Sequence, residues 1–304
     1  MISKPNVTSQ SFANMAVTLA WGAWAELGVS GWTSTHSDWA IDPEPLILFT
    51  AWLGDRDPRL RDEVTDWCIQ FGGYLSKTRL RTLLHQRPAI VQHAFGEFAA
   101  TVAAHNKSAW PGAGLARPYT PTMRSRLPDA RKPAMAWIRL RALFGIGARS
   151  EVIRCLLSAR GEWQSLSRLA TVSGYTKRNV SEACQLLQQA GLLAVRETGN
   201  RFDYSLARRT DLERFVGSLP SVRPDWSALL DVVAEMVGLE EAIETKSPLT
   251  MPIYVQQATR RIELDLKELD LVFLIEPGPR TSFSAATDLV RQLVTGWSRG
   301  LWPH

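Results

Sequence analysis

The stretch that decides the fold is Ser165-Leu-Ser-Arg-Leu-Ala-Thr-Val-Ser-Gly-Tyr-Thr176, followed directly by Lys177-Arg-Asn-Val-Ser-Glu-Ala-Cys-Gln-Leu-Leu-Gln-Gln-Ala190. Its first part predicts a two-turn helix, and then a tight turn in which Gly174 adopts the left-handed backbone that other residues resist. Thr176 is placed to cap a second helix, and Gly191 is placed to end it. The stretch therefore predicts two helices joined by a short turn.

The sequence on either side completes a larger unit. Ser150–Arg160 predicts an apolar helix that ends at Gly161. Beyond Gly191 the apolar period changes to two, and Leu193–Val195 and Phe202–Leu206 predict a β-hairpin around Glu197-Thr-Gly-Asn200. Three helices followed by a hairpin are typical of a winged helix-turn-helix.

The third helix of this unit presents two different faces. Val180, Ala183, Leu187 and Ala190 recur at helical spacing and are expected to pack on the other helices. The remaining side chains are polar, and Arg, Lys, Asn and Gln suit base edges in a major groove, which admits an α-helix. The residues expected to contact DNA, from the helix and from the hairpin tip, are Thr176, Lys177, Arg178, Asn179, Ser181, Gln185, Arg196, Asn200 and Arg201.

A resemblance supports this interpretation. Arg178-Asn-Val-Ser-Glu-Ala-Cys-Gln-Leu-Leu-Gln-Gln-Ala-Gly-Leu-Leu193, with Gly199-Asn-Arg-Phe-Asp-Tyr-Ser-Leu206, resembles the recognition helix and wing of bacterial transcriptional regulators of the ArsR and MarR type. The similarity is confined to residues 149–207. It implies binding of double-stranded DNA, usually as a homodimer, and hence sequence-specific regulation of transcription.

A second hypothesis stays open, because winged helices also serve as docking modules for proteins and a polar helix face can simply be solvated. In that case the chain is a protein-interaction module, such as the antitoxin or adaptor of a neighbouring gene product. The charge distribution favours DNA. The net charge is only +5, but seven basic side chains against one acidic side chain fall in residues 117–143, next to the predicted helix-turn-helix.

The fold class predicted for the whole chain is mainly α, with helical flanking domains and a small β-hairpin wing. We expect four parts: a helical domain over 1–105, a basic proline-rich linker over 106–133, the winged helix-turn-helix over 134–216 and a helical domain over 217–304. The linker is interpreted either as a basic arm that enters a groove or as a spacer with some phosphate contact.

The flanks predict mostly helices. The predicted segments are 12–27, 46–53, 61–70, 74–84, 89–104, 134–144, 210–216, 226–239, one from about 254, and 284–297, with a turn at 276–279 and a short apolar run at 271–275 that fits a buried strand. A faint internal repeat suggests that 1–105 is a degenerate second winged helix. Twelve tryptophans, with apolar stripes at Ala16–Trp24 and Leu229–Val237, predict a homodimer built by the flanking helices.

The sequence offers no catalytic constellation. The cysteines, Cys68, Cys155 and Cys184, have neither metal-pair nor disulfide-framework spacing, which predicts a reducing cytoplasm. No two histidines show the i, i+4 spacing of a zinc helix, and no phosphate-binding loop is present. We therefore expect neither an enzyme nor a cofactor or metal site. Glu26 interrupts the apolar N-terminal run, so no membrane partner is expected.

Overall fold

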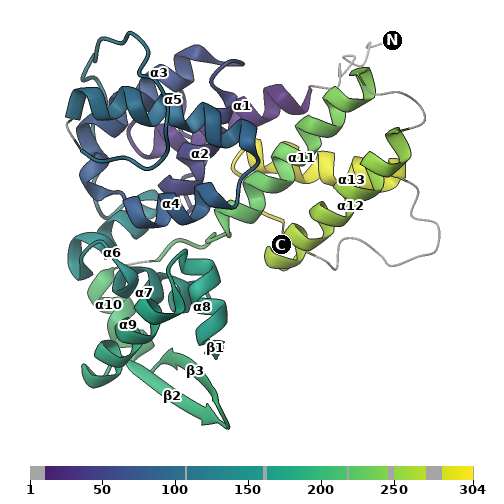
Figure 1. Cartoon of the computed structure of the whole chain (residues 1–304). Helices are drawn as coiled ribbons and strands as arrows, with labels where there is room; N and C mark the ends of the chain where they lie inside the picture. The colour runs from purple at the N-terminus through teal and green to yellow at the C-terminus, as the bar shows by residue number, and fades with distance from the viewer. Residues whose placement is uncertain are drawn as a thin grey trace, which may run out of the picture.

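The computed structural model shows a mainly helical chain with a small three-stranded antiparallel sheet (Figure 1). It describes residues 11–106, 108–159, 163–217, 219–245, 250–271 and 283–303. The predictions for Arg160 and Gly161, for the apolar run beyond Leu271 and for the turn that follows it lie outside these ranges.

Two groups of helices surround two separate hydrophobic cores. The helices of the first group are α1 (Phe12–Glu26), α2 (Pro43–Leu53), α3 (Pro58–Phe71), α4 (Lys77–His85), α5 (Ala89–Asn106), α11 (Trp226–Thr245), α12 (Met251–Glu268) and α13 (Phe283–Ser298). Two 3-10 turns, η1 (Gly72–Tyr74) and η2 (Pro133–Met135), also lie beside this core. The helices that were predicted from the sequence are thereby confirmed, with ends shifted by a few residues.

The second group forms a smaller lobe that ends in the sheet. Its helices are α6 (Ala136–Phe144), α7 (Ala148–Ser158), α8 (Leu166–Ser173), α9 (Lys177–Gln189) and α10 (Arg209–Val216). Its strands are β1 (Gln164–Ser165), β2 (Leu193–Thr198) and β3 (Arg201–Leu206), in the order β1-β3-β2. Thr198 pairs with Arg201, so the predicted hairpin is confirmed with a two-residue turn, Gly199-Asn200.

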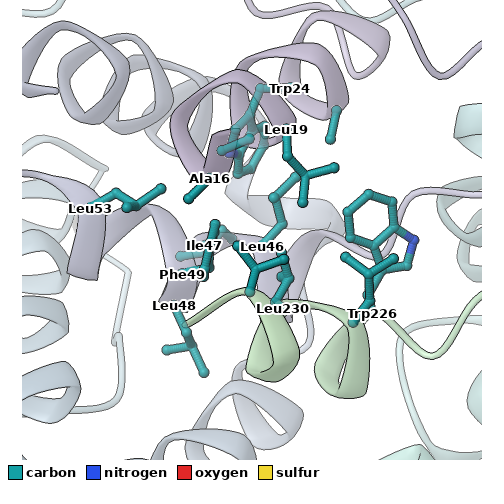
Figure 2. Close-up of a cluster of buried hydrophobic side chains, with 14 of the residues drawn as sticks. Ala16, Leu19, Trp24, Leu46, Ile47, Leu48, Phe49, Leu53, Trp226 and Leu230 are labelled. Carbon is teal, nitrogen blue, oxygen red and sulfur yellow. The ribbon is translucent and has the colours of Figure 1, made fainter. Parts of the chain in front are cut away.

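The first core joins sequence segments that were predicted as two separate domains. Side chains of α1, α2 and α11 meet in one cluster, where Leu46, Trp226 and Leu230 are fully or almost fully buried (Figure 2). The helices before residue 106 and those after residue 225 therefore fold around a common centre. Within residues 11–106 no two strands pair, so the structure gives no support to a degenerate winged helix there.

The two stripes assigned to a dimer interface lie inside this core. Ala16, Trp24, Leu229 and Val237 are all fully buried within one chain. The indole N–H of Trp24 donates to the Thr50 hydroxyl at 2.8 Å, so its polar atom also finds a partner internally. The prediction that these stripes pair two subunits is wrong, because the apolar surface is already used in folding the monomer.

The proline-rich segment before α6 is fixed against α3. The buried carboxylate of Asp66 accepts hydrogen bonds from the backbone N–H groups of Thr122 at 2.7 Å and Met123 at 3.0 Å. Arg117 donates to Asp62 at 2.7 Å. The segment is thus part of the first unit rather than a spacer or a groove-entering arm, and Arg117 does not contribute an unpaired charge.

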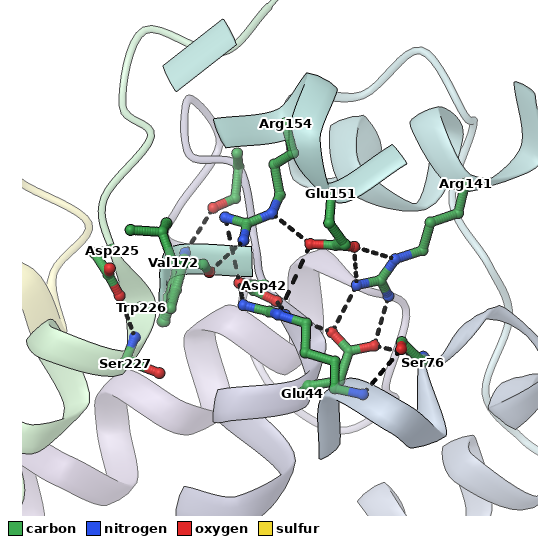
Figure 3. Close-up of polar contacts among 12 residues, drawn as sticks. Asp42, Glu44, Ser76, Arg141, Glu151, Arg154, Val172, Asp225, Trp226 and Ser227 are labelled. Atoms are coloured by element: carbon green, nitrogen blue, oxygen red, sulfur yellow. Dashed lines mark hydrogen bonds and ion pairs between the residues drawn. The ribbon is translucent and has the colours of Figure 1, made fainter. Parts of the chain in front are cut away.

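A buried ion cluster joins the two cores (Figure 3). Arg79 and Arg141 both donate to Glu44, at 2.8 Å and 2.6 Å respectively, so one carboxylate holds α4 and α6. Arg141 also donates to Glu151 of α7 at 2.7 Å, and Arg154 donates to the other oxygen of Glu151 at 2.7 Å. With Asp42, which Arg79 binds at 2.6 Å, the cluster contains three carboxylates and three guanidiniums. Arg141 was counted in the basic excess facing phosphate, and its burial here corrects that interpretation.

Candidate nucleic-acid interface

The turn between α8 and α9 has the local geometry that the sequence predicts. Ser165 caps α8 by accepting a hydrogen bond from the backbone N–H of Arg168 at 3.2 Å. Gly174 has φ of +71°, the left-handed region in which glycine avoids the strain of a Cβ. Thr176 then caps α9 by accepting from the backbone N–H of Asn179 at 3.3 Å. These contacts fix where α9 begins and in which direction it runs.

One face of α9 is buried and the other is free. Val180, Ala183 and Leu187 are buried in the second core, as predicted. Ala190 is exposed, because α9 ends at Gln189 and the chain turns away there, so its assignment to the packed face is wrong. Cys184 is buried instead, and burial raises the pKa of its thiol to about 12. A thiol with this pKa is a packing group, not a nucleophile at neutral pH.

The first turn of α9 carries the exposed polar side chains. Lys177, Arg178 and Asn179 are all exposed. Arg178 donates to Glu182 at 3.0 Å across one helical turn, and its side chain remains 88% exposed. An ion pair this exposed contributes little free energy, so a stronger acceptor can displace Glu182. The Thr176 hydroxyl hydrogen-bonds the side-chain oxygen of Asn179, which holds that amide at the start of the helix.

The remaining predicted site residues on α9 lie one turn further along. Gln185 is exposed, whereas Ser181 is half-buried beside the packed face. Among the residues predicted from the helix, the structure therefore places Ser181 least favourably for an external contact.

The hairpin tip carries two arginines around a single carboxylate. Arg201 donates to Asp203 at 2.9 Å and Arg196 donates to it at 3.2 Å. Burial opposes ionisation of Asp203, but the hydrogen bonds from both guanidiniums outweigh it and lower the pKa of this carboxyl. Glu197 is also exposed on this hairpin, so residues 196–203 carry two positive and two negative charges, and the positive charges are those of the two exposed guanidiniums. Asn200 is exposed in the turn itself.

Positive charge is concentrated in the lobe that contains α9. Residues 134–216 include thirteen Lys and Arg against seven Asp and Glu, an excess of six, whereas the net charge of the whole chain is +5. The remaining residues therefore carry a net charge of −1. Arg141, Arg154 and Glu151 of this lobe belong to the buried ion cluster, so its other charged residues leave an excess of five, and positive charge of this kind favours contact with a polyanion.

Sequence reasoning missed several residues around α9. Strand β1 pairs Gln164 with Tyr204, and a run of two residues gives no periodic signal. Arg149 is exposed at the start of α7 and lines a hollow of about 210 Å³ together with Asn179 and Leu186. Trp163 lies 4.8 Å from the Arg196 guanidinium and is 39% exposed. These contacts join residues distant in sequence, so only the fold reveals them.

The larger unit holds α8 and α9 in place. The Tyr175 hydroxyl, directly before the α9 cap, lies 2.6 Å from the hydroxyl of Ser76, which caps α4. Arg154 of the ion cluster donates to the carbonyl of Val172 in α8 at 3.1 Å (Figure 3). The orientation of α9 is therefore tied to the first core as well as to its own lobe.

Comparison with protein-family models, with curated proteins and with solved structures finds no match to this chain. Across the described residues, no group of three or more His, Cys, Asp or Glu side chains is arranged to hold a metal ion. No helix in the described ranges has the length and apolar character needed to cross a bilayer.

Proposed function

We propose that the chain is a sequence-specific DNA-binding regulator that reads double-stranded DNA with α9. The observation that carries the proposal is the exposed group Lys177, Arg178 and Asn179 on the first turn of a helix that follows a glycine turn. In helix-turn-helix proteins the residues near the N-terminus of the second helix contact base edges in the major groove. The polar face of α9 therefore carries side chains that suit base edges, at the end of the helix where such contacts are made.

Each exposed residue has a distinct expected role. Arg178 can donate two parallel hydrogen bonds to a guanine, and Asn179 can pair with an adenine, once each leaves its local partner. Lys177 and Arg149 lie at helix starts and suit phosphate oxygens, because backbone N–H groups there add to their positive charge. Specificity would then come from two residues and affinity from the cations around them.

The hairpin suits a supporting contact. Its tip, where Asp203 holds two exposed arginines, extends from the same lobe as α9 (Figure 1). In this arrangement Arg196 and Arg201 bind backbone phosphates or a minor groove, which adds affinity without selecting bases.

The test is selection of binding sequences from a random DNA pool by the full chain, followed by affinity measurements on the enriched sequence. We expect the double variant Arg178→Ala with Asn179→Ala to lose about 1–3 kcal/mol for each bidentate contact on the enriched sequence and little on random DNA. Gln257→Ala with Arg260→Ala, two exposed residues on α12, is the matched control and should leave both affinities unchanged. Identical binding of the double variant and the parent to both DNAs would show that α9 does not read bases.

One observation favours a second candidate function, a protein-interaction module such as an antitoxin or adaptor. Ile146 and Leu186 are 46% and 53% exposed, and both line the 210 Å³ hollow beside α9. Two exposed apolar side chains at one hollow suit a side chain of a partner protein better than a phosphate backbone. Loss of partner capture in Leu186→Ser, with DNA binding retained, would assign this hollow to a protein.

A further inference from the structure

A cavity of about 650 Å³ lies far from α9, between α2, the start of α5, α11 and α12. Its walls are formed largely by Leu48, Phe49 and Trp52 of α2 and Leu230 of α11, with Tyr254 of α12. This volume is within the range of small-molecule sites, which are typically apolar with a few polar groups that fix orientation.

The charged groups that line the cavity are four carboxylates and the guanidiniums of Arg87 and Arg261. The four carboxylates that line it are Asp231, Glu235, Glu241 and Asp265. Three of them have a guanidinium partner: Arg87 binds Asp231, Arg261 binds Glu235 at 2.6 Å, and Arg56 binds Glu241. Three of the four negative charges are therefore compensated by the protein.

Asp265 is the exception. It is half-buried in the cavity wall, and its carboxylate has no hydrogen bond or ion pair with any residue in the described ranges, although Arg87 and Arg261 attract it from a greater distance. Burial, together with the negative charge of Asp231, raises the pKa of Asp265 to about 7, and the charge of Arg87 opposes this only in part. An ionised carboxylate that is half-buried without an ion-pair partner raises the free energy of the folded protein, and a cation beside it would lower that free energy.

We propose that this cavity binds a small organic cation with an apolar or aromatic body. Asp265 would accept the ammonium group, and the Phe49, Trp52 and Tyr254 side chains would contact the body. Aromatic faces also attract cations, which strengthens the preference for a positively charged ligand. Four carboxylates and two guanidiniums in the cavity wall leave a net negative charge that disfavours anions, and a neutral ligand of the same shape leaves Asp265 uncompensated. This site is independent of DNA binding.

The test uses three probes with one phenyl-alkyl body and different head groups: 4-phenylbutylamine, 4-phenylbutanol and 4-phenylbutyrate. Each is titrated calorimetrically into the full chain without DNA. We expect the amine to bind at least about tenfold more tightly than the alcohol, because a hydrogen bond to a charged group is stronger than a neutral one, and the carboxylate to bind most weakly. Failure of all three to bind, or a carboxylate that binds as tightly as the amine, would overturn the proposal.

Variants locate the binding. Asp265→Asn should weaken the amine by about tenfold or more and leave the alcohol unchanged. It removes an unpaired charge, so thermal unfolding should show a folded protein. Glu263→Gln removes an exposed carboxylate of the same helix outside the cavity and should change neither ligand. An amine affinity unaffected by Asp265→Asn would place the cation elsewhere and refute the site. If Asp265→Asn does not fold, the relative affinities of the three probes for the parent chain still test the proposal.

Discussion

At the scale of single residues, ion pairs set the charge that the lobe presents to solvent. Asp203 holds both hairpin arginines, and Glu182 holds Arg178. The two pairs differ in burial: Asp203 is almost fully buried, whereas the side chains of Arg178 and Glu182 are both exposed. We therefore expect the hairpin arginines to keep their positions on binding and Arg178 to change partner.

Replacement of Arg201 by Ala tests the role of the hairpin tip. The variant should bind all DNA sequences more weakly, with the ratio of specific to random affinity unchanged, because phosphate contacts carry no base preference. The slope of log affinity against log salt should fall by about one unit. Fluorescence anisotropy with the enriched and a scrambled duplex measures both quantities, and Arg260→Ala on α12 is the control. A loss confined to one base pair would contradict the assignment of Arg201 to phosphate.

The sequence predicted the exposed face of α9 better than its packed face. Lys177, Arg178 and Asn179 are exposed as expected. A short run of charged and amide side chains contains no apolar residue whose burial would be favourable, so the run lies on the solvent side of the helix. Ala190 was misplaced on the predicted packing face, because small residues fit either side of a helix and periodicity alone does not fix the end of the helix.

At the scale of elements, the α8–α9 turn depends on one glycine. Gly174 combines a φ of +71° with a close neighbour: a Cβ there would lie 2.9 Å from the Arg79 Cγ. Arg79 belongs to the buried ion cluster, so this turn packs directly against the joint between the two cores.

Gly174→Ala should therefore destabilise the protein through both strain and contact. Left-handed backbone alone costs about 1–2 kcal/mol in a residue with a Cβ, and displacement of Arg79 adds to this. Gly199→Ala is the matched control, since Gly199 has a φ of +59° with open space around its Cβ position. Urea unfolding should show a larger loss for Gly174→Ala than for Gly199→Ala. Equal losses would mean that the contact with Arg79 has no energetic effect.

Helices and strands were predictable where the local sequence carries a signal for them. The helices and the hairpin follow from apolar period, caps and turn residues. The association of α1 and α2 with α11 was not predictable, because it depends on which apolar faces meet after the long stretch of chain between Leu53 and Trp226. The ion cluster was not predictable for the same reason, because its Asp42, Glu44 and Arg79 lie far in sequence from Glu151.

At the scale of the whole molecule, the ion cluster links stability to pH. Burial opposes ionisation of Glu151, but the charges of Arg141 and Arg154 outweigh it and lower the pKa of this carboxyl. A carboxyl whose pKa is lower in the folded state stabilises the protein above its unfolded pKa of about 4.3, and this stabilisation is lost as pH falls toward the folded value. The free energy of unfolding should therefore decrease below about pH 4.5.

Glu151→Gln isolates this effect. At pH 7 the variant should lose about 3–5 kcal/mol, because it leaves buried guanidiniums without their partner. Between neutral and acidic pH its free energy of unfolding should fall less than that of the parent, since one carboxyl no longer takes up a proton. Urea titrations at several pH values measure both. A parallel decline in variant and parent would show that Glu151 does not contribute to the pH dependence.

The number of chains that bind one DNA site is also a property of the whole molecule. One recognition helix reads only a few base pairs, and helix-turn-helix regulators commonly pair two of them across a two-fold axis. We therefore propose a homodimer on DNA, although the Ala16–Trp24 and Leu229–Val237 stripes are internal and must be replaced by another surface. Light scattering with the enriched duplex should give a protein mass of twice 33.9 kDa. A mass of one chain with and without DNA would contradict the dimer.

The most direct test of the central claim, that the α9 lobe binds DNA, is the salt dependence of duplex binding by the full chain. If Arg149, Lys177, Arg196 and Arg201 each neutralise one phosphate, affinity should fall by roughly a hundredfold between about 50 mM and 200 mM salt. Anisotropy titrations with the enriched duplex over this range measure the slope. We expect a steep linear decrease of log affinity with log salt. Absence of binding at the lowest salt, or an affinity independent of salt, would contradict it.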